Sequence, residues 1–341
     1  MKGIQINEFG KFKWVDGHES LDGLDDVKVR LTKALITEDD VALMCGEDKT
    51  LPLPFIPVRF AVGKISELDK DQSALSRGDR VVISAVEPCG SCPSCVSGAD
   101  ENCYNFVVAG KNKDGFLKDF AVTNVSNVYP LPQSVKDQDA IYLEYVSLAL
   151  SVIEKLNVKK SSHVAIVGGN VFASILAQLL IYYQAVPIMI DDKESSLRHA
   201  KKLGIYYTVS SLSKPEKEIA TITGGRMANS VVYVTRSGIS TDLPYKIAAP
   251  HAPIVFAGFS YPNLKIPTTL AMNKQLDTFC ISSSYGNHHA AINLLATKAI
   301  DLSHYEYENV KMSEIEQTLE KSISAFNKKS PVTNVLVDLM N

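Results

Sequence analysis

The sequence predicts an α/β protein in which a β-rich part precedes a doubly wound parallel sheet. Three observations support this prediction. Short β-type segments separated by turn residues run from Lys2 to Val128. From Leu143 onwards, apolar strands alternate with amphipathic helices, which is the pattern of parallel βαβ units. A length of 341 residues indicates about two domains, at roughly 150 residues each.

The expected elements follow one another along the chain in three groups. In the β-rich part we expect strands at Val27–Leu31, Phe60–Ile65, Arg80–Val86 and Phe120–Val125. The alternating part predicts strands at Val164–Val167, Pro187–Ile190, Ser230–Val234 and Ile254–Ala257, with helices at Val171–Tyr183 and Ser195–Leu203. The end of the chain predicts helices at His288–Ala299 and Ser313–Ala325 and a last strand at Thr333–Leu339.

The charge balance excludes several classes of partner. The chain has 35 Lys and Arg against 38 Asp and Glu, a formal net charge of −3. It therefore lacks the positive field of a protein that binds nucleic acid or an anionic membrane. The first residues contain no apolar core of a signal peptide. The most apolar stretch, Ile175–Ile190, is interrupted by polar residues and by Pro187, so it is too short for a bilayer span. We expect a soluble, cytoplasmic protein.

Four of the six cysteines are closely spaced, in the pattern C-x2-C-x2-C-x7-C. They are Cys89, Cys92, Cys95 and Cys103. A disulfide framework scatters its cysteines so that they close loops, whereas thiolates this close together suit one tetrahedral Zn²⁺. Free thiols on a loop are the alternative. Four thiolates leave no open position for substrate, so we expect one structural zinc. Cys280, in an apolar segment, is expected to be a packed core thiol.

An incomplete dinucleotide signature follows the predicted strand Val164–Val167. Gly168 and Ala173 match the first and third positions of G-x-G-x-x-G/A in a Rossmann sheet, but Asn170 replaces the middle glycine. Asn visits left-handed backbone geometry more readily than most residues, and its side chain would point towards the phosphates.

An acidic residue ends the next strand at the expected distance. Asp191 stands where a carboxylate binds a ribose 2′-hydroxyl, and with Asp192 it would repel a 2′-phosphate, so NAD is favoured over NADP. The alternative is a Rossmann-type sheet that no longer binds a dinucleotide. The residues expected to bind the cofactor are Gly168, Gly169, Asn170, Val171 and Asp191.

The order of these features resembles that of the zinc-containing alcohol dehydrogenases of the medium-chain dehydrogenase/reductase superfamily. The resemblance covers nearly the whole chain. It is most specific at C-G-x-C-x-x-C-x-x-G-x-x-x-x-C, met in full from Cys89 to Cys103. It implies a GroES-like domain made of residues 1–144 and 285–341, with the zinc lobe at 89–103, and a Rossmann domain of residues 145–284. It also implies an active site between the two domains and a homodimer or homotetramer.

The sequence departs from this family at the site of the catalytic zinc. Family members carry Cys-Gly-Ser/Thr-Asp-x-His and then Gly-His-Glu, and the second motif here reads Val58-Arg59-Phe60. In the first motif Cys45 and Asp48 remain, but Glu47 replaces the relay hydroxyl and Thr50 replaces the histidine. Glu144 occupies the family's last ligand position.

Two ligands are too few for a catalytic zinc. Such a metal needs about three protein ligands and an open site, and a guanidinium at the histidine position would repel a cation. We therefore expect no catalytic zinc, although a misaligned histidine would change this. We further expect Arg59 to place its charge where the metal would lie and to pair with Glu144 or Asp48. The alternative is an Arg59 that faces solvent.

Three functions remain open. The leading one is an NAD(H)-dependent oxidoreductase that acts without catalytic zinc on a small carbonyl, alcohol or activated alkene. Its candidate catalytic residues are Cys45, Glu47, Asp48, Arg59 and Glu144. The alternatives are a non-catalytic homologue that serves as a binding or structural subunit, and a zinc-dependent polyol or alcohol dehydrogenase with atypical ligands. The expected partner is a small-molecule substrate.

Overall fold

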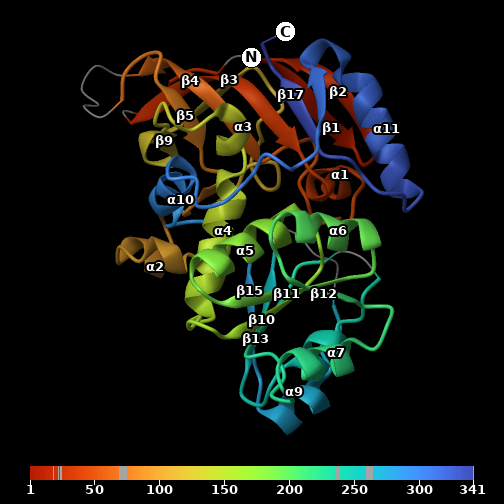
Figure 1. The fold of residues 1–341 in the computed structure, drawn as a ribbon. Coiled ribbons are helices and arrows are strands. Elements are labelled where there is room, and N and C mark those ends of the chain that lie inside the picture. The colour runs from red at the N-terminus through yellow and green to blue at the C-terminus, as the bar shows by residue number, and fades with distance from the viewer. Residues whose placement is uncertain are drawn as a thin grey trace. The chain divides into compact units, whose positions relative to one another are not determined.

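Two β-sheets organise the computed structural model, which describes residues 1–341 except 18, 22, 24, 69–74, 236–237, 259–263 and 341 (Figure 1). The chain divides into two compact units. The first unit joins Met1–Glu144 to Glu306–Asn341, and the second is Tyr145–Tyr305.

The second boundary lies later in the chain than the expected return at residue 285. Two hydrogen bonds tie residues 284–305 to the second unit. Ser147 Oγ donates to the Ser284 carbonyl at 2.5 Å, and Gln178 Nε2 donates to Tyr305 Oη at 3.2 Å. The segment that follows the last strand of the second unit therefore packs there before the chain returns.

The first unit is built on a seven-stranded sheet. Six strands follow the order β16-β17-β3-β4-β5-β9, and β8 also pairs with β3. All neighbours are antiparallel except β16 and β17. The strands are β3 (Asp26–Ile36), β4 (Phe60–Leu68), β5 (Arg80–Ile83), β8 (Phe120–Asn124), β9 (Val128–Pro130), β16 (Glu308–Lys311) and β17 (Val335–Asp338).

Smaller elements complete this unit. Two antiparallel pairs lie outside the main sheet. They are β1 (Lys2–Glu8) with β2 (Lys11–Asp16), and β6 (Val86–Glu87) with β7 (Val107–Val108). The helices are α1 (Glu38–Met44), α2 (Pro93–Val96), α3 (Asp137–Ala140) and α11 (Ile315–Asn327), with 3-10 turns η1 (Asp100–Asn102), η2 (Val125–Asn127) and η3 (Met312–Glu314). Helix α4 (Leu143–Lys155) crosses the boundary between the units.

The second unit contains a parallel sheet of six strands in the order β12-β11-β10-β13-β14-β15. The strands are β10 (His163–Val167), β11 (Val186–Asp191), β12 (Tyr207–Ser210), β13 (Ser230–Tyr233), β14 (Pro253–Ala257) and β15 (Asp277–Ile281). The helices are α5 (Val171–Tyr182), α6 (Glu194–Lys202), α7 (Pro215–Ile222), α8 (Asp242–Ile247), α9 (Thr268–Lys274) and α10 (His288–Ala296). Val167 is in register with Ile190 and Tyr233, so the carboxyl ends of three strands meet at one edge.

This architecture confirms the predicted fold class, a doubly wound parallel sheet combined with a β-rich unit. Two strands of the parallel sheet, β12 and β15, were not predicted, and neither was α1. The placement of Cys280 was wrong, because this residue is exposed on the edge strand β15.

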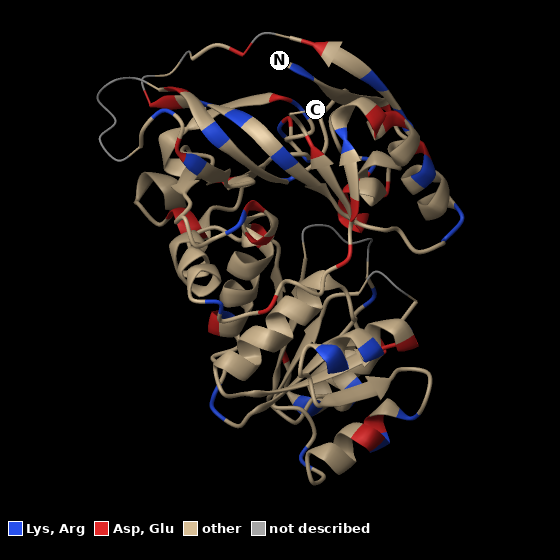
Figure 2. Ribbon diagram, turned by 45° about the horizontal axis from the view of Figure 1, so that its top comes forward, with Lys and Arg blue, Asp and Glu red and all other residues tan. Residues whose placement is uncertain are grey.

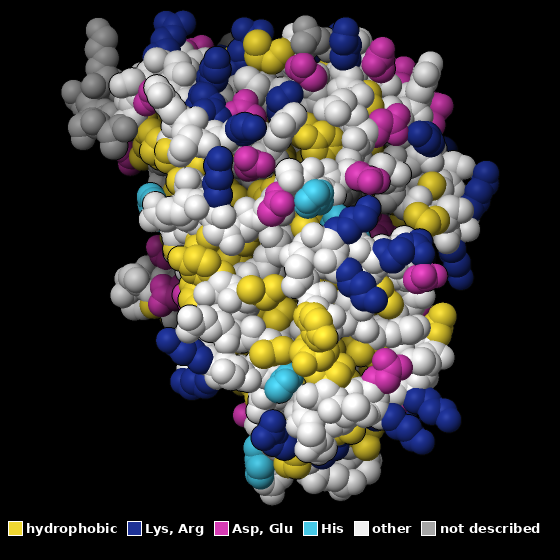
Figure 3. Space-filling view, viewed as in Figure 1, with side chains coloured by type: hydrophobic (Ala, Val, Ile, Leu, Met, Phe, Trp, Pro, Cys, Tyr) yellow, Lys and Arg dark blue, Asp and Glu magenta, His cyan; other side chains and the backbone are white. Residues whose placement is uncertain are grey.

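Charged residues of both signs are spread along the ribbon of both units (Figure 2). The face seen in Figure 3 carries both Lys and Arg side chains and Asp and Glu side chains. This mixing agrees with the small formal net charge of −3.

Candidate functional site

The four closely spaced cysteines converge in the first unit. Their sulfur atoms all lie within 4.8 Å of one another. The Sγ–Sγ distance is 3.5 Å from Cys92 to Cys95, and 4.0 Å from Cys92 to Cys103 and from Cys89 to Cys95. Sulfurs bound at 2.3 Å to a tetrahedral zinc lie about 3.8 Å apart. The cluster therefore fits one structural zinc ion with a closed set of thiolates.

Backbone groups prepare this cluster for a cation. The N–H groups of Cys89 and Asn105 each donate to Cys103 Sγ at 3.4 Å. Hydrogen bonds from the Ser91 and Cys92 backbones lower the pKa of Cys89 to about 6, whereas desolvation raises the pKa of Cys95 to about 12. Hydrogen bonds, first from the Cys95 backbone, also lower the pKa of Cys92, so the cluster favours the thiolate form at Cys89 and Cys92 and opposes it at Cys95.

Arg59 forms a buried ion pair with a carboxylate that the sequence analysis missed. Its Nη2 lies 3.2 Å from Asp40 Oδ1, and the two side chains are 0% and 1% exposed. Asp40 Oδ2 accepts hydrogen bonds from the Thr37 backbone N–H at 2.9 Å and from Thr37 Oγ1 at 2.7 Å. Asp40 lies in the first turn of α1, where a helix favours negative charge. A signal was present in the sequence, because Thr37 and Asp40 have the spacing of a helix capping motif.

The residue before Arg59 holds an unusual backbone conformation. Val58 has φ = 81°, in the left-handed region that a β-branched residue rarely adopts. Its carbonyl accepts from the Phe116 N–H at 2.9 Å, and a Cβ at Gly115 would collide with that same carbonyl. The family motif has glycine here. The chain therefore keeps the backbone path of a glycine with a valine.

The remaining predicted catalytic residues occupy different environments. Burial raises the pKa of the Cys45 thiol to about 11, so this sulfur is protonated at neutral pH. Glu47 is half-buried just after α1, with Oε2 out of reach of solvent. Asp48 Oδ1 accepts from Thr50 N at 3.0 Å and from Thr50 Oγ1 at 2.6 Å, which makes a local turn. The Glu144 side chain is buried, and its Oε1 accepts from the Ala85 N–H at 3.1 Å.

The expected nucleotide turn lies between β10 and α5. Gly168 has φ = 119°, and a Cβ there would lie 2.8 Å from Thr235 Cβ, so only glycine fits. Val171 begins α5. These features keep the backbone of a dinucleotide-binding turn.

Asn170 does not use the left-handed geometry that its residue type tolerates. Its φ of −77° and ψ of 179° are extended, not left-handed. Its Oδ1 accepts from the Ala173 N–H at 2.8 Å, and its Nδ2 donates to the Val234 carbonyl at 2.9 Å. The side chain therefore caps α5, and it occupies one of the N–H groups that a helix offers to a phosphate.

Asp191 stands beside this turn at the end of β11. Its carboxylate accepts from the Gly169 N–H and, at 2.7 Å, from the Lys193 N–H. Desolvation raises the pKa of Asp191 to about 6. A dinucleotide fits this turn in part, because Asp191 is in place for a ribose but the phosphate end is modified by Asn170.

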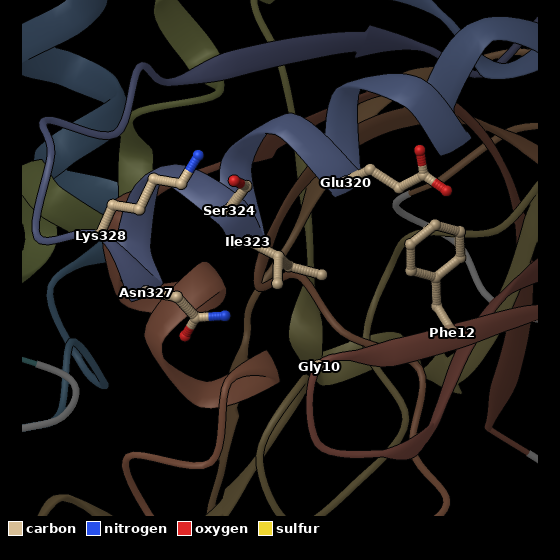
Figure 4. Close-up of a pocket in the computed structure, with 7 residues that line it drawn as sticks. All are labelled: Gly10, Phe12, Glu320, Ile323, Ser324, Asn327 and Lys328. Carbon is tan, nitrogen blue, oxygen red and sulfur yellow. The ribbon is translucent and has the colours of Figure 1, made fainter.

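Two hollows have volumes suited to small molecules. One, of about 390 Å³, lies between α11 and the β1–β2 hairpin, and Figure 4 shows Phe12 facing Glu320 and Ile323 there. The other, of about 580 Å³, lies in the second unit around residues 156–163. In the described part of the chain, no helix combines the length and the apolar character that a membrane span requires.

Comparisons with known proteins agree with this geometry. Residues 23–133 match the family described as alcohol dehydrogenase GroES-like domain. A zinc-type alcohol dehydrogenase-like protein of Haemophilus influenzae is 27% identical over 85% of this chain and 86% of its own length. The L-threonine 3-dehydrogenase of Coxiella burnetii is 28% identical over 58% of each chain.

Solved structures share the fold. Galactitol-1-phosphate dehydrogenase of Escherichia coli has a TM-score of 0.85 at 19% identity, covering 99% of this chain and 100% of the other. A short chain alcohol dehydrogenase (rspB) of Escherichia coli CFT073, complexed with NADH, has a TM-score of 0.86 at 22% identity, covering 99% of both chains. These findings show that residues 23–133 match the GroES-like domain of alcohol dehydrogenases, and that the chain is similar to zinc-type alcohol dehydrogenase-like proteins over most of its length.

Proposed function

We propose that the protein is an NAD(H)-dependent oxidoreductase that binds one structural zinc and works without a catalytic zinc. The buried Arg59–Asp40 ion pair is the observation that supports this most strongly. Arg59 stands where the family has a zinc-binding histidine, and its charge is neutralised inside the protein. Nearby, the high pKa of the Cys45 thiol opposes the thiolate form that binds zinc.

The arrangement of ligands supports the same proposal. Among the residues that the structure describes, the Cys89 cluster is the one group of three or more His, Cys, Asp or Glu side chains that converges for a metal. Glu144 gives one oxygen to the Ala85 N–H. Because Arg59 is buried, its role in this proposal is to stabilise the first unit, not to polarise a substrate.

The chemistry that a nicotinamide supplies is hydride transfer to or from a carbon atom. The protein then has to orient the substrate and move one proton. We propose Glu47 as the proton-transfer group, because its carboxyl group is partly shielded from water at the end of α1. The substrate class is a small carbonyl, alcohol or activated alkene.

A zinc count and a cofactor titration test this proposal. Elemental analysis should find one zinc per chain in the wild type and in Cys45→Ser, and none in Cys92→Ser. A second zinc that disappears in Cys45→Ser would contradict the proposal and favour a zinc-dependent dehydrogenase. NADH at about a hundred times its Kd should stabilise the protein by roughly 2.7 kcal/mol in a thermal-shift assay.

The role of Glu47 is tested separately. Glu47→Gln should lower kcat with little change in KM and should alter the pH profile, whereas Glu101→Gln on the zinc lobe should do neither. Equal kinetics in the two variants would exclude proton transfer by Glu47.

A non-catalytic homologue is the second candidate. The observation that favours it is the capping of α5 by Asn170, which removes one phosphate-binding N–H. A zinc-loaded protein that responds to none of NAD⁺, NADH, NADP⁺ or NADPH would support this candidate.

We also propose a homodimer or homotetramer, since β15 is an edge strand; light scattering would test it.

A further inference from the structure

The hollow described above in the second unit lies at the sheet edge opposite the nucleotide turn. Its lining comes from residues 156–163, which connect α4 to β10, and from Arg226, Asn229 and Ser230, which lead into β13. Both segments enter the amino ends of their strands, whereas Gly168 follows the carboxyl end of β10. Dinucleotides bind outside the carboxyl ends of such sheets, so this hollow is a separate feature.

The charged residues in the lining are all basic. Lys159, Lys160, His163 and Arg226 all contribute, and no lining residue is acidic. Within the described ranges, Lys160 and Arg226 form no ion pair with a carboxylate. Desolvation lowers the pKa of His163, and the positive charge of Arg226 lowers it further. The guanidinium of Arg226 therefore acts electrostatically on the His163 imidazole. We call this feature the basic hollow.

Hydrogen bonds hold the frame of the basic hollow. The His163 N–H donates to Asn229 Oδ1 at 2.8 Å, and the Asn229 N–H donates back to the His163 carbonyl at 2.9 Å. The Ser161 N–H donates to the Gln184 carbonyl at 2.7 Å. Arg226 Nε donates to the Thr223 carbonyl at 3.2 Å, which anchors the guanidinium by one nitrogen and leaves its terminal nitrogens for a ligand.

We propose that the basic hollow binds a small anion that bears a phosphate group. Arg226 offers the paired N–H groups that match phosphate oxygens, and the two lysines add positive charge. A volume of about 580 Å³ falls within the range of small-molecule pockets. Several cations without carboxylate partners repel one another, and a bound phosphate relieves that repulsion.

Calorimetric titration tests the proposal with inorganic phosphate and with AMP, each at constant ionic strength and with the zinc-loaded protein. Three proteins are compared: wild type, Lys160→Gln/Arg226→Gln, and Lys201→Gln/Lys202→Gln. The last variant loses the same charge from exposed positions on α6, so it controls for net charge. All three should unfold at similar temperatures without ligand, because the altered side chains are exposed.

We expect the double variant of the basic hollow to bind about tenfold or more weakly than both other proteins. Tighter binding of AMP than of inorganic phosphate would identify an organic phosphate as the ligand, and the reverse would identify free phosphate. Equal binding by all three proteins, which would place the anion elsewhere, overturns the proposal. So does the absence of binding to the wild type. AMP is also the adenylate half of NADH, and binding at the nucleotide turn would be equal in all three proteins, so only a loss confined to the double variant assigns the anion to the basic hollow.

Discussion

Replacing Arg59 by Met should strongly destabilise the first unit. Two unit charges 3.2 Å apart attract by about 5 kcal/mol at an effective dielectric constant of about 20. Part of this is offset by the cost of burying both charges, but removing one partner leaves the Asp40 carboxylate buried and uncompensated. We therefore expect a loss of about 3–5 kcal/mol in the free energy of unfolding at neutral pH.

The chain contains its own reporter for this measurement. Trp14 is the single tryptophan, and it lies in β2 against the core of the first unit. Urea unfolding followed by tryptophan fluorescence therefore reports on the unit that contains Arg59. The second unit, which has no tryptophan, does not obscure the signal.

A double variant and a pH series separate the charge effect from lost packing. Arg59→Met/Asp40→Asn removes both charges and keeps an acceptor for the Thr37 N–H, so it should recover at least about 2 kcal/mol. Burial raises the pKa of Asp40 above its unfolded value. A raised pKa means that folding favours the protonated form, so the deficit of Arg59→Met should be full at high pH and shrink on acidification. A loss under about 1 kcal/mol, or no recovery in the double variant, would refute the reasoning.

Three further predictions concern other parts of the chain. At position 58, the Gly variant should be more stable than the Ala variant by about 1 kcal/mol in the same fluorescence assay, because a left-handed backbone strains any residue with a Cβ and this strain outweighs the usual cost of glycine; the opposite order would show that the backbone is unstrained. Zinc uptake by the metal-free protein should weaken as the pH falls through about 6, since the depressed pKa of Cys89 means that its thiolate is lost there, and uptake that is constant from pH 8 to 5 would contradict this. Asn170→Gly should tighten NADH binding by about tenfold by freeing the Ala173 N–H, measured by NADH fluorescence, whereas unchanged affinity would show that the cap does not compete with phosphate.

The sequence predicted the features that depend on local pattern. Short segments of the sequence contain the whole signal for the apolar strands β10, β11 and β13 and for the cysteine cluster at 89–103. The structure confirms the fold and the convergence of the thiols. Edge strands were missed because one side of them meets solvent. β15 contains Cys280 in an apolar context, yet the side chain is exposed.

The partner of Arg59 could not be predicted from motif positions. The resemblance directed attention to Asp48 and Glu144, which the family motifs contain. Asp40 lies on the inward face of α1, and only the packing of that helix brings its carboxylate to 3.2 Å from the guanidinium. The geometry of Asn170 could not be predicted for a related reason. Its side chain caps α5 while it donates to the Val234 carbonyl, which lies just after β13 and far along the chain.

The split course of the first unit has a consequence for how the protein is made. β17, at Val335–Asp338, pairs with β3 inside the seven-stranded sheet, so this sheet is incomplete until β17 itself has left the ribosome. The second unit, one continuous stretch from Tyr145 to Tyr305, is finished earlier. The usual order of folding during synthesis, in which the N-terminal part folds first, is therefore reversed. During translation β3 therefore lacks its neighbour β17 until the whole second unit has been made.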